Sequence, residues 1–149
     1  MKKKILIIQG SSLKKINIKT DTSFFLGLEA QRRSYQIYYY EPRDLSFING
    51  KVTALCSKVK FVDNSKKPVK VLNKKVLNLL QAKLILIRSE PPFNQQYINT
   101  TFILEHISKK VRIINYPKAL REVPEKLFSL RLTKFMPKTL ISENLNEIK

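Results

Sequence analysis

A short run of charged residues and prolines follows the apolar segment 83–87. In this run, Arg88 and Glu90 stand just before Pro91 and Pro92. Proline fixes its own φ angle and restricts the residue before it, so the run is predicted to form a rigid, extended loop. A guanidinium held there can bind a carboxylate through two parallel hydrogen bonds. Arg88 is therefore a candidate anion ligand, and an ion pair with Glu90 or another acid is the alternative.

A second polar loop follows the apolar run 4–8 and extends over residues 9–19. It carries four side chains that can form hydrogen bonds or bind anions: Ser11, Ser12, Asn17 and Lys19. If both apolar runs are parallel strands of one sheet, the loops after them open at the same carboxyl edge, where ligands of α/β proteins bind. The two loops are therefore predicted to line one site.

Other kinds of catalytic site have little support. His106 is the only histidine, which excludes a multi-histidine metal site, and it is interpreted as an ordinary helix residue. Cys56, the only cysteine, has no histidine near it in sequence and is interpreted as structural. Three glycines in the whole chain cannot form a glycine-rich phosphate loop. No catalytic residue and no metal ligand is assigned.

The chain has a formal net charge of +18, from 29 basic and 11 acidic residues. Such a charge favours anionic partners. Lysine is spread along the whole chain, however, so most of the charge is interpreted as solvated surface. No helix-turn-helix, zinc finger or ribonucleoprotein motif occurs, and no nucleic-acid partner is expected. The alternative to an enzyme is a non-catalytic basic module that binds a small anion or a partner protein.

The sequence also predicts a cytoplasmic protein without a membrane partner. A single cysteine excludes an internal disulfide framework. The apolar run after the first lysines is too short for a signal peptide. No run approaches the roughly 18 apolar residues that span a bilayer.

The elements that position the two loops form an α/β pattern. The run 4–8 is predicted to be a buried strand, Asp21 an N-cap, 22–34 an amphipathic helix and 35–40 the next strand. The pattern resumes at 83–87 with three further elements: a strand over 83–87, a helix over 94–109 and a strand over 111–115. Such a strand–helix–strand order predicts a mainly parallel sheet with helices on both faces.

Three further segments have their own signals. Asn49-Gly50 accepts the positive φ angles of a type I′ turn and predicts an inserted β-hairpin over 43–62. The polar stretch 63–75 is predicted to be a mobile connection. After residue 117 come short helical pieces, a predicted strand over 135–141 and an amphipathic beginning at 142–149. We therefore expect one domain over 1–122 and the start of a truncated second domain over 123–149.

Many short motifs of this chain, in order and with similar spacing, resemble bacterial glutathione synthetases. The motifs that carry the resemblance are Asn17-Ile18-Lys19, Asp21-Thr22-Ser23-Phe24, residues 28–35, Asp44-Leu45, Ile48-Asn49-Gly50, residues 88–93, residues 101–105, Asn115, Pro117, Leu120-Arg121 and residues 125–128. They cover nearly the whole chain, and their combination is specific although no single motif is.

The resemblance implies an ATP-grasp ligase that joins γ-glutamylcysteine to glycine with ATP and magnesium. It implies a Rossmann-like pre-ATP-grasp domain followed by the start of an ATP-grasp domain. Carried over by position, Arg88, Asn17 and Glu90 would bind the peptide substrate, and Lys126 would approach nucleotide phosphate. Ser89-Glu90 stand where the family prefers Lys-Asp.

The family's main ATP-binding and magnesium-binding residues lie beyond the end of this chain. The isolated chain is therefore expected not to be a competent ligase. A separate ATP-grasp chain or a homo-oligomer would be compatible with this expectation.

Overall fold

The computed structural model describes residues 4–63, 67–90, 92–124 and 127–149. Seven strands form one sheet: β1 (Lys4–Gly10), β2 (Tyr35–Tyr40), β3 (Leu45–Ile48), β4 (Lys51–Phe61), β5 (Val69–Asn78), β6 (Leu84–Arg88) and β7 (Arg112–Ile114). The α-helices are α1 (Thr22–Arg32), α2 (Gln95–Glu105), α3 (Pro117–Glu122) and α4 (Leu145–Ile148). Short 3₁₀ turns are η1 (Leu13–Lys15), η2 (Pro42–Asp44), η3 (Leu79–Gln81) and η4 (Phe128–Phe135).

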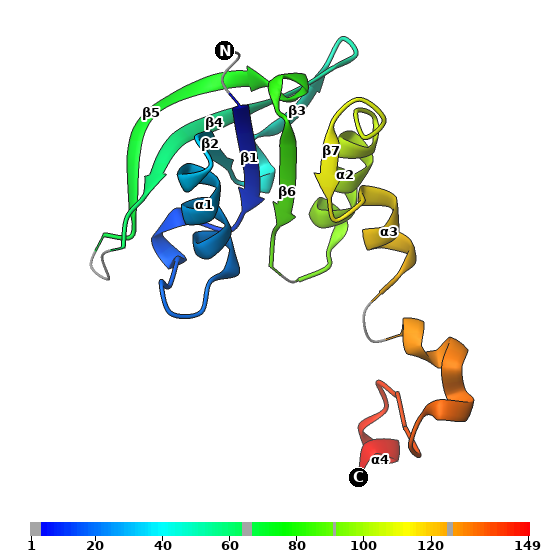
Figure 1. The fold of residues 1–149 in the computed structure, drawn as a ribbon. Coiled ribbons are helices and arrows are strands. Elements are labelled where there is room, and N and C mark those ends of the chain that lie inside the picture. The colour runs from blue at the N-terminus through cyan, green and yellow to red at the C-terminus, as the bar shows by residue number, and fades with distance from the viewer. Residues whose placement is uncertain (1–3, 64–66, 91, 125–126) are drawn as a thin grey trace.

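The sheet is mixed. Its order is β3-β4-β2-β1-β6-β7, with β5 on the other edge of β4. β1 is parallel to both β2 and β6, and β6 is parallel to β7. β4 is antiparallel to β2, β3 and β5, and it forms hairpins with β3 and β5, its neighbours in sequence. The chain therefore has an α/β fold, but the predicted mainly parallel sheet is not confirmed. The long β4–β5 pair curls over one end of the molecule (Figure 1).

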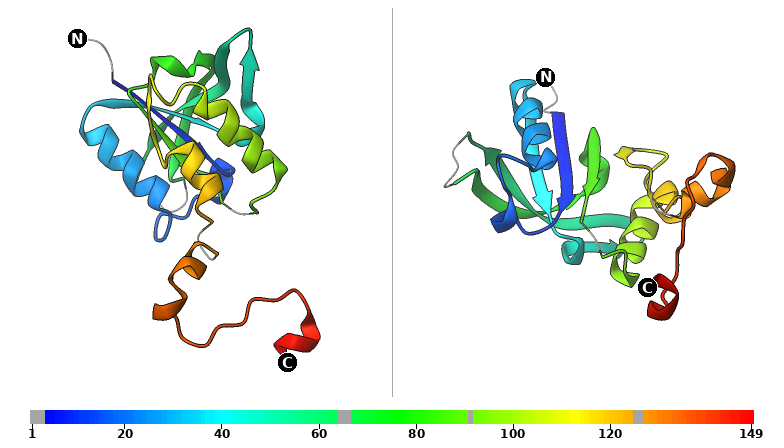
Figure 2. Two further views of the ribbon diagram at one scale, coloured as in Figure 1. Left: turned by 90° about the vertical axis from the view of Figure 1, so that its right-hand side faces the viewer. Right: turned by 90° about the horizontal axis from the view of Figure 1, so that it is seen from below.

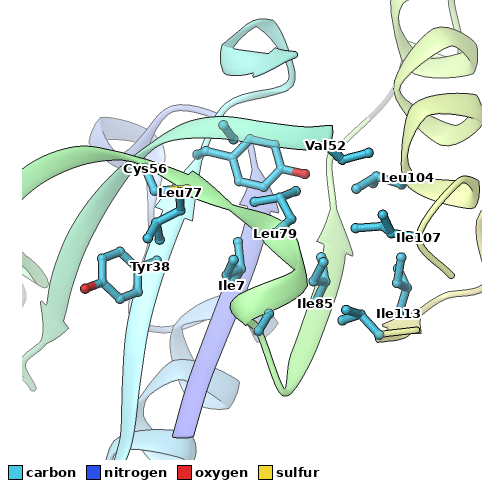
Figure 3. Close-up of a cluster of buried hydrophobic side chains, with 14 of the residues drawn as sticks. Ile7, Tyr38, Val52, Cys56, Leu77, Leu79, Ile85, Leu104, Ile107 and Ile113 are labelled. Carbon is cyan, nitrogen blue, oxygen red and sulfur yellow. The ribbon is translucent and has the colours of Figure 1, made fainter. Parts of the chain in front are cut away.

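A hydrophobic cluster lies on each face of the sheet. On one face, Ile7, Tyr38 and Ile85 pack with Leu104 of α2 and with Ile107, which follows that helix (Figure 3). On the other face, α1 contributes Phe24 to a cluster that includes Leu6, Ile8, Ile37, Tyr39, Val59, Phe61 and Leu86. Helices thus cover both faces of the parallel part of the sheet, as expected. The apolar runs of β1 and β6 are buried on both sides, as their sequences predict.

The predicted helix over 22–34 is confirmed as α1, which ends slightly earlier at Arg32. The carboxylate of Asp21 accepts a hydrogen bond from the Ser23 backbone N–H at 2.7 Å and caps the first turn. Ser34 has a φ angle of 63°, a left-handed conformation that turns the chain into β2.

The inserted hairpin is confirmed. Asn49 and Gly50 both have positive φ angles, 48° and 77°, as a type I′ turn requires, and they join β3 to β4. The predicted mobile connection over 63–75 is wrong for most of its length, because β5 begins at Val69. β5 pairs with β4 through backbone hydrogen bonds, and its lysines are exposed. Its sequence therefore lacks the usual apolar alternation of a strand. Residues 64–66 lie outside the described part of the chain.

The helix predicted over 94–109 is confirmed as α2 but ends at Glu105. The strand predicted over 111–115 is β7. The strand predicted over 135–141 is wrong: the η4 turn extends to Phe135, and residues 136–141 pair with no described strand. A strand is stable only against a neighbour, and this segment lies far from the sheet (Figure 2). Residues 127–149 project away from the rest of the protein.

Candidate functional site

The two polar loops that follow β1 and β6 meet in one pocket of about 170 Å³. The strands are neighbours in the parallel part of the sheet, and their register places Gly10 beside Arg88. The loops therefore leave the sheet side by side at its carboxyl edge, as the sequence predicts. The pocket is lined by Ser11, Ser12, Lys15, Ile16, Asn17, Thr20, Asp21, Thr22, Ser23, Tyr39, Arg88 and Glu90.

All three residues predicted to bind substrate, Arg88, Asn17 and Glu90, lie in this lining. Arg88 is exposed, and no ion pair joins it to Glu90 or to another carboxylate among the described residues. The alternative interpretation of Arg88 as an internal ion pair is therefore not supported. Lys19, from the same loop as Asn17, is not part of the lining.

Asn17 stabilises the conformation of the first loop through two hydrogen bonds. Its side-chain oxygen accepts a hydrogen bond from the Lys19 backbone N–H at 2.9 Å. Its backbone oxygen accepts one from the Asp21 backbone N–H, also at 2.9 Å. The second of these bonds joins Asn17 to Asp21, the N-cap of α1. The first loop of the pocket is therefore attached directly to the start of the helix.

The charges of the lining suit a ligand that carries both signs. Arg88 and Lys15 are cationic, whereas Asp21 and Glu90 are anionic. The cations can bind a carboxylate, and the carboxylates can accept hydrogen bonds from an ammonium group. An amino-acid-like zwitterion carries both groups and matches this arrangement.

Tyr39 forms a wall of the pocket that sequence reasoning missed. Its hydroxyl donates a hydrogen bond to the Ser11 backbone oxygen at 2.7 Å. Burial raises the pKa of the Tyr39 phenol well above its ordinary value, so the hydroxyl remains a donor. A Cβ atom on Gly10 would lie 2.1 Å from this hydroxyl, so only glycine leaves room for the contact. The parallel register of β1 and β2, which brings the ring here, is a tertiary property that no local motif shows.

The two residues interpreted as structural, Cys56 and His106, lie outside the pocket lining. Cys56 is buried in β4, and burial raises the pKa of its thiol to about 12. His106 is exposed at the end of α2, with its ring 5.0 Å from that of Phe47, measured between centroids. No cluster of three or more potential metal ligands occurs among the described residues. Lys126, expected near nucleotide phosphate, lies outside the described part of the chain.

None of the helices in the described ranges is long and apolar enough to cross a bilayer.

Comparison with known proteins gives one consistent result. Residues 4–121 match the family model described as the N-terminal domain of prokaryotic glutathione synthetase. The chain is 39% identical over 138 residues to glutathione synthetase of Buchnera aphidicola, a match that covers 92% of this chain and 43% of that protein. It is 38% identical over 148 residues to the Mesorhizobium japonicum enzyme, covering 99% of this chain and 47% of the relative.

The enzyme of Escherichia coli is 38% identical over 135 residues, which are 90% of this chain and 43% of the relative. The chain thus spans less than half the length of the curated relatives it matches. Because the family model covers both loops of the pocket and the whole sheet, the chain belongs to the family of prokaryotic glutathione synthetase N-terminal domains.

Proposed function

We propose that this chain is the substrate-side part of a glutathione synthetase, which joins γ-glutamylcysteine to glycine with hydrolysis of ATP. Residues 1–122 form its Rossmann-like pre-ATP-grasp domain, and residues 123–149 begin the ATP-grasp domain. Arg88, Asn17 and Glu90 bind γ-glutamylcysteine, and the protein works in the cytoplasm. Family membership supports the reaction, and the mixed charge of the pocket supports the place of the substrate.

The observation that carries the proposal is the meeting of Arg88 with two carboxylates, Asp21 and Glu90, in one pocket. The glutamyl end of γ-glutamylcysteine has a free α-ammonium and a free α-carboxylate, because its peptide bond uses the side-chain carboxyl. Arg88 can bind that carboxylate bidentately. Asp21 and Glu90 can accept hydrogen bonds from the ammonium.

The reaction needs ATP and magnesium, and the described residues do not fit a magnesium ion. Magnesium prefers carboxylate oxygens in octahedral geometry, and no suitable cluster of side chains occurs in the described ranges. We assign to nucleotide phosphate only Lys126, on the strength of the family motif. This chain's own contribution is to bind and orient the peptide.

An exposed apolar surface in the 127–135 segment supports an additional protein part beside it. Phe128, Leu130, Leu132 and Phe135 are exposed by 37%, 44%, 52% and 75%. Several large apolar side chains exposed within one short segment are typical of a surface that another protein part covers. We propose that an ATP-grasp domain covers them, and that the 149-residue chain alone does not make glutathione.

The test is a ligase assay in two arms. The chain is incubated with ATP, Mg²⁺, γ-glutamylcysteine and glycine, first alone and then with the part of the Escherichia coli enzyme that the chain does not match. We expect no glutathione from the chain alone and measurable glutathione in the second arm, above that of the added part by itself. If the second arm forms no glutathione and γ-glutamylcysteine does not bind the chain, the chain is a non-catalytic module instead.

A further inference from the structure

Gln9 is a fully buried polar residue. It lies near the end of β1 with 0% of its surface exposed, between Tyr40 in β2 and Ile87 in β6, its partners in the strand register. Burial of an amide is costly unless its polar atoms form hydrogen bonds. An apolar side chain would fill this position without that cost, so the contacts of the amide are informative.

Both ends of the Gln9 amide are used. The Tyr40 hydroxyl donates a hydrogen bond to Gln9 Oε1 at 2.8 Å. Gln9 Nε2 in turn donates to Ser89 Oγ at 3.0 Å. Tyr40 is itself fully buried, and burial raises the pKa of its phenol well above the ordinary value, so the hydroxyl remains a donor. The result is a chain of hydrogen bonds, buried at Tyr40 and partly buried at Ser89, that runs from β2 through β1 to the loop after β6.

Ser89 stands between the two charged residues of that loop. The backbone register of β1 and β6 ends at the pair Gly10 and Arg88, so Ser89 lies just beyond the sheet. Its side-chain hydrogen bond to Gln9 therefore continues the attachment of the loop where the backbone register stops. A serine fixed there restrains the backbone that carries Arg88 and Glu90, the residues that line the pocket.

We infer that Gln9 and Ser89 are positioning residues for the pocket. They hold the 88–90 loop in its binding conformation before the ligand arrives and do not touch the ligand themselves. A ligand that meets a loop already in place does not lose affinity to the ordering of that loop. The identity of the ligand rests on the proposed function, whereas the restraint of the loop does not.

The first experiment is a calorimetric titration of γ-glutamylcysteine into the 149-residue chain and its Ser89→Ala variant. We expect affinity to fall by about 3- to 10-fold, the range for loss of one hydrogen bond. Ser89→Thr, which keeps the hydroxyl, should restore most of it. Ser108→Ala is the matched control, because Ser108 also donates a side-chain hydrogen bond, at 2.8 Å to the Glu105 backbone oxygen, but at the end of α2. It should bind like the unmodified chain.

A double-variant cycle tests the pair itself. Gln9→Met removes the same hydrogen bond from the other side, so adding it to Ser89→Ala should lower affinity by less than the product of the two single effects. Urea unfolding of each variant confirms that it is folded. Full multiplicativity of the two effects would contradict the pairing.

Backbone ¹⁵N relaxation of residues 88–90 tests the restraint without any ligand. We expect faster internal motion of these amides in Ser89→Ala and no change in Ser108→Ala. Unchanged relaxation in Ser89→Ala overturns the inference, whether or not γ-glutamylcysteine binds. So does unchanged affinity in Ser89→Ala when Arg88→Ala weakens binding. Absence of binding by the unmodified chain contradicts the proposed ligand. In that case the relaxation data by themselves test whether Ser89 restrains the loop.

Discussion

The side-chain amide of Gln31 makes two hydrogen bonds to the backbone of Phe61. Gln31 Nε2 donates to the Phe61 carbonyl oxygen at 3.0 Å, and the Phe61 N–H donates to Gln31 Oε1 at 2.6 Å. These bonds fasten α1 to the end of β4. Because α1 begins at the pocket, they also help to hold the first loop in place.

Replacement of Gln31 by leucine should therefore destabilise the fold. The variant keeps the size of the side chain but leaves the Phe61 N–H and C=O without these partners, which costs about 2 kcal/mol of unfolding free energy. Urea unfolding followed by circular dichroism measures the change. The control is Arg32→Ala on the same helix, whose side chain is 78% exposed and whose loss should change stability by less than about 0.5 kcal/mol. Equal stabilities of the two variants would show that water replaces the amide without cost.

Gly27 allows α1 to lie close against β4. A Cβ atom at Gly27 would lie 2.3 Å and 2.4 Å from two atoms of the Phe61 ring, which is itself 1% exposed. Alanine favours a helix by about 1 kcal/mol over glycine, but overpacking in a core costs about 1–3 kcal/mol. We expect Gly27→Ala to lower the free energy of unfolding, measured by urea titration. A more stable variant would mean that the Phe61 ring moves aside freely.

The sequence predicts local structure wherever a single residue type is decisive. Asp21 marks the start of α1, and Asn49-Gly50 marks the hairpin, because N-caps and type I′ turns depend on few neighbours. Arg88 and Asn17 are predicted to lie at one edge, because the loops that follow neighbouring parallel strands lie together. Local signals of this kind therefore located both loops of the pocket.

The remaining features depend on partners that are distant in sequence. The sequence of β5 predicts a polar connection, because a strand at a sheet edge can expose lysines such as Lys74 and so lacks a clear strand pattern. The segment 135–141 has the apolar content of a strand but no described neighbour to pair with. Tyr39 and Gln9 become important only through the register of β1 with β2 and β6, which the sequence does not specify locally.

Arg121 anchors α3 to α2. Its guanidinium donates hydrogen bonds to the Glu105 carboxylate and, at 3.0 Å, to Thr101 Oγ1, and it lies 3.8 Å from the centroid of the Phe102 ring. The Arg121 side chain is only 14% exposed. Its loss would therefore leave the Glu105 carboxylate and the Thr101 hydroxyl without this partner at a site that water reaches poorly. We expect Arg121→Ala to lower stability by about 2 kcal/mol.

Relative to the unmodified chain, amide hydrogen exchange in the Arg121→Ala variant should become faster in α3 and change less in the strands. The matched control is Lys118→Ala, which removes an exposed ion pair of α3 and should change stability by less than about 1 kcal/mol. A similar loss in both variants would show that general charge on α3, and not the Arg121 contacts, holds the helix.

Burial of Cys56 predicts loss of stability at alkaline pH. The pKa of its thiol is raised from 9.0 to about 12 in the fold, so between these values the unfolded chain binds fewer protons than the folded chain. The free energy of unfolding is therefore unaffected by this group below about pH 9 and falls as pH rises toward about 12. The buried phenols of Tyr39 and Tyr40, whose pKa values are also raised, act in the same direction.

Urea unfolding across this pH range should show a shallower decline in Cys56→Ala than in the unmodified chain. Ellman's reagent should react slowly with the native thiol at neutral pH and rapidly once urea unfolds the chain. Parallel pH profiles for the two proteins, or rapid labelling of the native chain, would contradict a buried, neutral thiol.

The most direct test of the proposed substrate pocket is a calorimetric titration of γ-glutamylcysteine into the chain and into two arginine variants. Arg88→Ala removes the proposed bidentate contact and should weaken saturable binding by about 10- to 100-fold. Arg32→Ala removes the same charge from an exposed helix position outside the pocket lining and should leave affinity unchanged. Equal affinity of Arg88→Ala and the unmodified chain, or absence of saturable binding by the unmodified chain, would contradict the account.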